Sequence, residues 1–152
     1  MLWSAIVMNA RVIVAVVGVV TLLLGIAGLV YPEEVMRFVG YAYPNPPNLP
    51  GTRGEVRALY GGLMIAAGVL TLLAVPSPQA NQGRLLLLGL LWLGAGGGRV
   101  FGVFMDGNPG LIGWLSVVAE LGGGGALLFA SQFAARSVPT APGGSEAPPF
   151  RA

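Results

Sequence analysis

The chain has 152 residues, of which 55% are hydrophobic and only 9% are charged, and its formal net charge at pH 7 is +2. A soluble domain carries about a quarter charged residues, so this composition indicates an integral membrane protein. The small, dispersed positive charge excludes the basic patch that nucleic-acid binding requires. Since the sequence has neither cysteine nor histidine, it lacks the usual thiolate and imidazole metal ligands and the usual general base. We therefore expect no metal site and no enzymatic activity.

Four apolar runs are long enough, or nearly so, for the roughly 20 residues with which a helix crosses a bilayer. Because lipid offers the backbone no hydrogen-bond partners, each run should be a helix. The first run exceeds the apolar core of a typical signal peptide, so we expect it to be retained. We predict an all-α, integral membrane four-helix bundle, up-down-up-down, within residues 1–136, whose helices span about residues 11–31, 56–75, 85–105 and 111–135.

The loop after the first span, residues 32–54, divides into two parts. The first part, PEEVMRFVGYAY, mixes apolar and charged residues in a pattern that suits a short amphipathic helix at the membrane interface, with proline in its first turn. The second part, PNPPNLPGTRG, is too rich in proline and glycine for a helix or strand, and we expect a stiff extended cover. This loop is either a simple connector or a docking surface for another protein.

Small residues recur at four-residue spacing within the predicted spans, which allows neighbouring helices to approach closely. The residues that we expect at these helix contacts are Gly61, Gly62, Gly94, Gly98, Gly102 and Gly123. The run of four glycines at 122–125 either packs closely, loosens the fourth helix, or leaves room for a flat ligand such as a lipid, quinone or pigment. We predict no other cofactor.

Two charges stand inside the predicted third and fourth spans at matching heights. Arg99 lies roughly 10 Å below the short turn that follows the third helix, and Glu120 lies roughly 15 Å below it on the returning helix. An arginine side chain covers this difference, so we predict an ion pair between Arg99 and Glu120. Such a pair would also explain how two costly intramembrane charges are tolerated.

Other polar groups lie near the same membrane surface and are expected to join this pair. The predicted intramembrane polar network consists of Arg57, Tyr60, Arg99, Asp106 and Glu120. One interpretation is a fixed network that sets the register of the helices, because buried pairs often serve specificity more than stability. The other is a path for protons or ions, since carboxylates inside membranes mark relays. A single deeply placed acid without histidine favours the fixed network.

Arginines outside the spans favour the side that holds both termini. That side carries Arg11, Arg84, Arg136 and Arg151, whereas the opposite side carries Arg37 and Arg53. By the positive-inside rule, we expect a multi-pass protein of the bacterial cytoplasmic membrane with both termini in the cytoplasm.

Three short motifs follow each other in the predicted helices: E-V-R-A-L-Y-G-G at residues 55–62, G-R-V-F-G at 98–102 and D-G at 106–107. With them the chain resembles a widespread bacterial family of small four-helix membrane proteins that is known only as a domain of unknown function. The likeness extends over about residues 12–133. The resemblance implies that Arg57, Tyr60, Arg99 and Asp106 belong to a shared polar site, and it implies no activity.

Three functions follow from these patterns as expectations. The first is a non-enzymatic accessory or stabilising subunit of a larger membrane complex, such as an energy-converting, photosynthetic or respiratory assembly. Its partners would be membrane lipids and other subunits, contacted through the loop 32–54 and the linker-like tail 137–152. The alternatives are a small transporter of ions, protons or a solute through the polar network, and a binding module for a lipid, quinone or pigment.

Overall fold

The computed structural model describes residues 2–39 and 49–135. The predicted tail 137–152 and the middle of the first loop lie outside the described residues. Within the described part every regular element is helical. In chain order these elements are α1 (Leu2–Val30), α2 (Pro32–Phe38), α3 (Leu49–Val56), the π-helix η1 (Arg57–Leu63), α4 (Met64–Leu72), α5 (Gln82–Asp106) and α6 (Gly110–Ala135).

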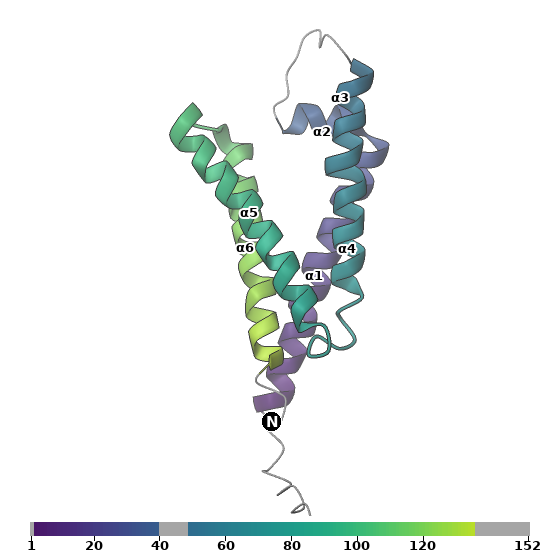
Figure 1. Ribbon diagram of the computed structural model, residues 1–152, viewed down its shortest axis with the longest axis vertical. Helices are drawn as coiled ribbons and strands as arrows, with labels where there is room; N and C mark the ends of the chain where they lie inside the picture. Colours follow the sequence, from purple (N-terminus) through teal and green to yellow (C-terminus); the bar gives the residue numbers. More distant parts are fainter. Residues whose placement is uncertain (1, 40–48, 136–152) are drawn as a thin grey trace, which may run out of the picture.

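Four stretches are long and apolar enough to cross a membrane: Asn9–Val30, Pro50–Leu72, Gln82–Asp106 and Gly110–Gln132. The second of these runs through α3, η1 and α4, which form one continuous rod (Figure 1). The start of α1 and the end of α6 lie at the same end of the molecule, as an even number of spans requires (Figure 1). The predicted four-helix, multi-pass membrane fold is therefore confirmed.

The helices form two antiparallel pairs, α1 with the η1–α4 rod and α5 with α6. The pairs meet near the end where α1 begins and diverge toward the end that carries α2 and α3, so that the molecule has the shape of a V (Figure 1). The buried core lies where the pairs meet, and its largest fully buried side chains are Leu85, Leu127 and Val14. Many other leucines and valines point outward, as expected for helices in contact with lipid.

Glycines hold α1 close to the rod. A Cβ added at Gly25 would lie 2.6 Å from the backbone nitrogen of Ile65, and one added at Gly68 would lie 2.6 Å from the backbone nitrogen of Leu22. Gly61 faces the backbone of Leu29 in the same way, at 3.1 Å. The two backbones are thus in contact, and only residues without a side chain fit between them.

A second set of glycines joins α5 to α6. A Cβ at Gly89 would lie 3.0 Å from the carbonyl oxygen of Gly124, and one at Gly124 would lie 2.8 Å from the carbonyl oxygen of Gly89. One helical turn from Arg99, a Cβ at Gly96 would lie 2.6 Å from Leu121 Cδ2. Close approach at these positions allows the backbones of the two helices to touch.

The structure corrects most of the predicted packing glycines. Of these six, Gly61 alone lies at a helix contact, since a Cβ at Gly94, Gly98 or Gly123 would have no neighbour within 4 Å. A Cβ at Gly102 would approach only Asp106 on its own helix, and one at Gly62 only the carbonyl oxygen of Arg57. At about 100° per residue, the strip 94–98–102 lies on the side of α5 roughly opposite to Gly89 and Gly96. The strip therefore faces away from α6.

The first loop is partly as predicted. The short helix α2 is present, with Pro32 in its first turn and Met36 buried beneath it. The extended cover is wrong for residues 49–54, because α3 begins at Leu49 and adds almost two turns to the second span. Pro50 is compatible with this helix since the first turn leaves its N–H groups unpaired anyway.

Candidate functional site

The centre of the site is the ion pair between α5 and α6. Arg99 Nε lies 2.8 Å from both carboxylate oxygens of Glu120, which confirms the predicted contact. The Glu120 side chain is only 9% exposed, whereas that of Arg99 is 35% exposed. Gly96 makes the pairing possible, because a Cβ there would already press on the Cβ of Glu120 at 3.3 Å.

A tight turn sets the height of the two partners. Gly107 and Gly110 adopt positive φ values of 94° and 72°, a conformation that glycine reaches without strain. Between them, the Asn108 Oδ1 atom accepts hydrogen bonds from the backbone N–H of Gly110, at 3.1 Å, and from Trp114 Nε1, at 3.2 Å. The turn is thus tied to the first residues of α6, which fixes the register of this helix against α5.

Tyr60 approaches the ion pair from the other helix pair. It lines the same cavities as Arg99 and Glu120. Tyr60 belongs to the π-helix η1, whose seven residues are RALYGGL. Segments of π-helix are rare and are found frequently at functional sites. Sequence reasoning missed the π-helix because its residues have no preference that separates it from an α-helix.

Two cavities meet at this cluster. The first has a volume of about 320 Å³ and is lined by α1, α2, η1, α4, α5 and α6. The second has a volume of about 310 Å³ and lies between the rod and α5. Both are walled mainly by apolar side chains. The residues common to both are Tyr60, Met64, Trp92, Arg99 and Glu120. The polar cluster therefore stands at the junction of two apolar spaces.

Two members of the predicted network lie apart from this cluster. Arg57 is exposed, and its Nε donates to the carbonyl oxygen of Leu29 at 3.3 Å, so that it covers the end of α1. Asp106 is exposed at the end of α5, where it lines a separate hollow of about 260 Å³ beside the turn. Arg99 reaches this hollow as well, yet among the described residues it forms an ion pair with Glu120 alone. The described cluster thus consists of Tyr60, Arg99 and Glu120.

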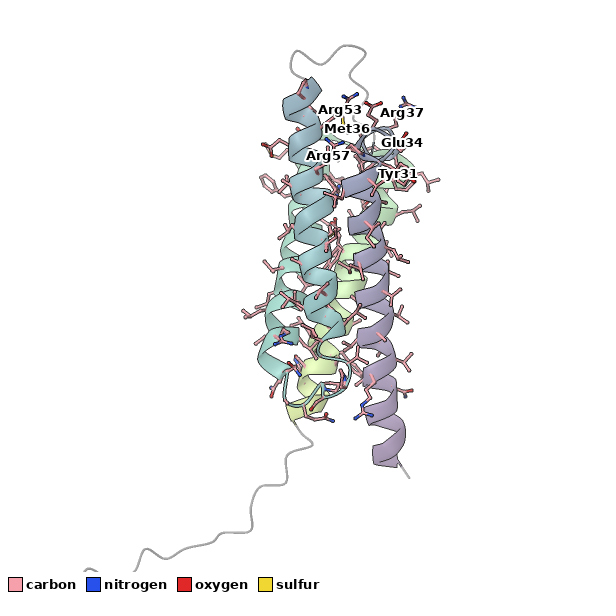
Figure 2. The ribbon with its side chains drawn as sticks, turned by 90° about the vertical axis from the view of Figure 1, so that its right-hand side faces the viewer. Tyr31, Glu34, Met36, Arg37, Arg53 and Arg57 are labelled. Carbon is pink, nitrogen blue, oxygen red and sulfur yellow. The ribbon has the colours of Figure 1, made fainter. Side chains whose placement is uncertain are left out.

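A second polar group, which the sequence did not predict, fastens α2 to α3. Arg53 forms an ion pair with Glu33 across the two helices. Figure 2 shows Arg53 beside Arg37 and Glu34 at this end of the molecule, with Arg57 one turn further along the rod. Pairing of Arg53 with Glu33 became possible only because residues 49–54 are helical. It holds α2 across the wide end of the V.

A metal site is not built by these groups. In the described ranges, no three histidine, cysteine or carboxylate side chains come close enough together to hold a metal ion. The cluster itself offers hydrogen-bond donors and acceptors among apolar side chains.

Comparison with known proteins places this site in a family. The family profile described as "Domain of unknown function (DUF4345)" matches residues 9–131. The chain belongs to this family. The DUF4345 match includes η1, the turn after α5 and all three residues of the cluster. No curated protein and no solved structure matches the chain.

Proposed function

We propose that the protein is a membrane binding module that holds a lipid-soluble molecule between its two helix pairs. The observation that carries this proposal is the junction of two apolar cavities at the one cluster of Tyr60, Arg99 and Glu120. Small-molecule sites are typically concave, have volumes of about 300–1,000 Å³, and combine apolar walls with a few converging polar groups. Each cavity meets this description.

The location of the cavities supports a ligand that arrives from the bilayer. Leu59 and Leu63 of the rod and Leu91 of α5 line the second cavity and are each more than half exposed. They lie in spans that cross the membrane, so their exposed sides face the hydrocarbon region. A molecule dissolved in the membrane reaches the cluster between these side chains without crossing water.

The binding module can be tested by asking what the protein retains. We expect that protein extracted with its surrounding lipid into polymer-bounded discs, then treated with organic solvent, yields one amphiphile enriched over the bulk membrane extract. Ala119 lines the first cavity, so Ala119→Leu should fill it and lower the enrichment. Ala66 is exposed on α4 and lines neither cavity, so Ala66→Leu is the matched control. An extract of unaltered bulk composition from the unsubstituted protein would contradict the proposal.

An accessory subunit is the second candidate, and the same opening favours it. A transmembrane helix of a partner protein is about 10–12 Å wide with its side chains, and the exposed leucines offer it an apolar face on each side of the V. In this case a stoichiometric membrane protein, rather than an amphiphile, should accompany the chain in mild detergent, and Ala119→Leu or Leu91→Ala should weaken that association. Transport through the cluster stays a prediction.

A further inference from the structure

We propose that the molecule bound at this junction is an uncharged quinone, whose ring carbonyl accepts a hydrogen bond from Arg99 and whose apolar chain lies in one of the two cavities. This inference rests on the proposed function and specifies the class of its ligand. It is argued from the donors that Arg99 leaves open, from the charge of the cluster, and from its depth.

Arg99 has hydrogen-bond donors beyond those that Glu120 uses. Both hydrogen bonds to the carboxylate come from Nε, whereas a guanidinium carries five N–H donors, four of them on the terminal nitrogens. Within the described residues Glu120 is the hydrogen-bond partner of Arg99, so the terminal nitrogens have no acceptor there. The Arg99 side chain is 35% exposed and lines both cavities as well as the hollow beside Asp106. A carbonyl oxygen held in either cavity can therefore accept a hydrogen bond from one of its terminal nitrogens.

The charge of the cluster selects against ions. Arg99 and Glu120 together are neutral, and among the residues described as lining either cavity Arg99 is the one cation. An anionic headgroup at Arg99 would lie beside the Glu120 carboxylate, and a cationic one would lie beside the guanidinium, so both meet repulsion in a medium of low dielectric constant. A neutral acceptor meets neither.

The depth of the cluster argues against a lipid headgroup. Arg99 is seven residues from the end of α5, or roughly 10 Å at 1.5 Å per residue, whereas headgroups occupy the interface outside the hydrocarbon core. Trp92 and Tyr60 line both cavities, and aromatic side chains favour stacking with a flat ring. A quinone ring is planar and uncharged, and its carbonyl oxygen can lie at this depth in the membrane.

The test uses decylubiquinone as probe and the single Trp92 as reporter. Protein with Trp3→Phe and Trp114→Phe, reconstituted in phosphatidylcholine nanodiscs, is titrated with decylubiquinone, which quenches tryptophan fluorescence. We expect saturable quenching of Trp92, whereas quinone that is merely dissolved in the bilayer would give quenching that rises without saturation. Dioleoylglycerol, which carries uncharged ester carbonyls, and dioleoyl phosphatidic acid, which is anionic, serve as competitors, and neither should displace the quinone.

Two variants separate ligand binding from a purely structural role. Arg99→Lys keeps the positive charge opposite Glu120 but removes the N–H donors of the two terminal guanidinium nitrogens. Decylubiquinone should therefore bind at least about tenfold more weakly. Ala119→Leu, which leaves the ion pair intact, should also weaken binding, whereas Ala66→Leu should not. The thermal midpoint of each variant is measured alongside, and the Ala119→Leu result stands if Arg99→Lys fails to fold.

The outcomes distinguish the inference from the function on which it rests. Unchanged quinone affinity in both Arg99→Lys and Ala119→Leu would overturn the inference, as would displacement by phosphatidic acid. If dioleoylglycerol displaces the bound quinone, or if another amphiphile is recovered with the protein while decylubiquinone fails to bind, the inference falls and the binding module stands. If no amphiphile is recovered and decylubiquinone does not bind, both fall.

Discussion

Replacing Gly68 with alanine tests how α1 and the rod are held together. In the structure, a Cβ at this position would lie 2.6 Å from the backbone nitrogen of Leu22 and 2.8 Å from its Cα. Ordinary van der Waals contacts of a Cβ begin at about 3.4 Å, so the two helices would have to separate by about 0.6–0.8 Å. No rotamer change relieves this clash, because the opposing atoms belong to the backbone.

The size of the effect follows from that separation. A radial gap of 0.5–1 Å forfeits about a quarter to a half of the dispersion energy between the surfaces that it divides, and overpacking of a closed interface costs about 1–3 kcal/mol. We expect Gly68→Ala at the upper end of this range, because the same contact also includes Gly25 and Gly61. For a chain of this length, that corresponds to a thermal midpoint lower by several degrees.

Gly98→Ala is the matched control in another span. A Cβ there would have no neighbour within 4 Å, so we expect stability within about 0.5 kcal/mol of the unsubstituted protein. Thermal unfolding in a mild detergent, followed by loss of the monodisperse chromatographic peak, measures both variants. If Gly68→Ala were as stable as the unsubstituted protein, the contact described between α1 and the rod would be refuted. If Gly98→Ala were destabilised as strongly as Gly68→Ala, the strip of residues 94, 98 and 102 would be a helix contact after all.

Three further changes probe the ion pair, the π-helix and the α2–α3 link. Glu120→Gln should lower the free energy of unfolding by about 3–5 kcal/mol because it strands Arg99, and the double variant with Arg99→Gln should lose less than the sum of the single changes; additivity in this cycle would contradict the pair. Deleting Gly62 should turn η1 into an α-helix and rotate α3 by about 100° against α4. The chain has no cysteine of its own, so cysteines placed at positions 33 and 53 report on this rotation. They should cross-link in the full-length chain but not in the deletion variant. Arg53→Gln should change stability by less than about 1 kcal/mol, as exposed ion pairs usually do; a larger loss would show that α2 supports the spans themselves.

The elements set by hydropathy were predictable from the sequence, and so was the central pair. Spans of about 20 apolar residues leave the backbone little choice but a helix. Arg99 and Glu120 could be matched because a short turn between two regular helices makes height a simple count of residues. Both inferences need only local geometry and the cost of an isolated charge in lipid.

The features that depend on helix orientation were not predictable in this way. Four-residue spacing identifies a strip on α5 but not the direction in which it points, and Gly89 with Gly96 offers a second strip on the opposite side. Its height near the same membrane surface predicts that Arg57 joins the cluster, but height does not give the direction of a side chain, and the π-helix η1 changes that direction. Proline and glycine in 49–54 suggested a loop, although the single proline among them, Pro50, lies in the first turn, where a helix tolerates it.

The turn between α5 and α6 is a spacer whose length the site depends on. Residues 107–109 alone separate the two helices. The hydrogen bonds that Asn108 accepts fix the conformation of this turn against the start of α6. One added residue would displace Glu120 by about 1.5 Å along α6 and turn it by about 100° away from Arg99. Surface loops usually accept insertions, but a glycine inserted here should abolish the coupling energy between the two charges. The length of a turn at the end of the helices thus decides whether Arg99 and Glu120 can pair inside the membrane.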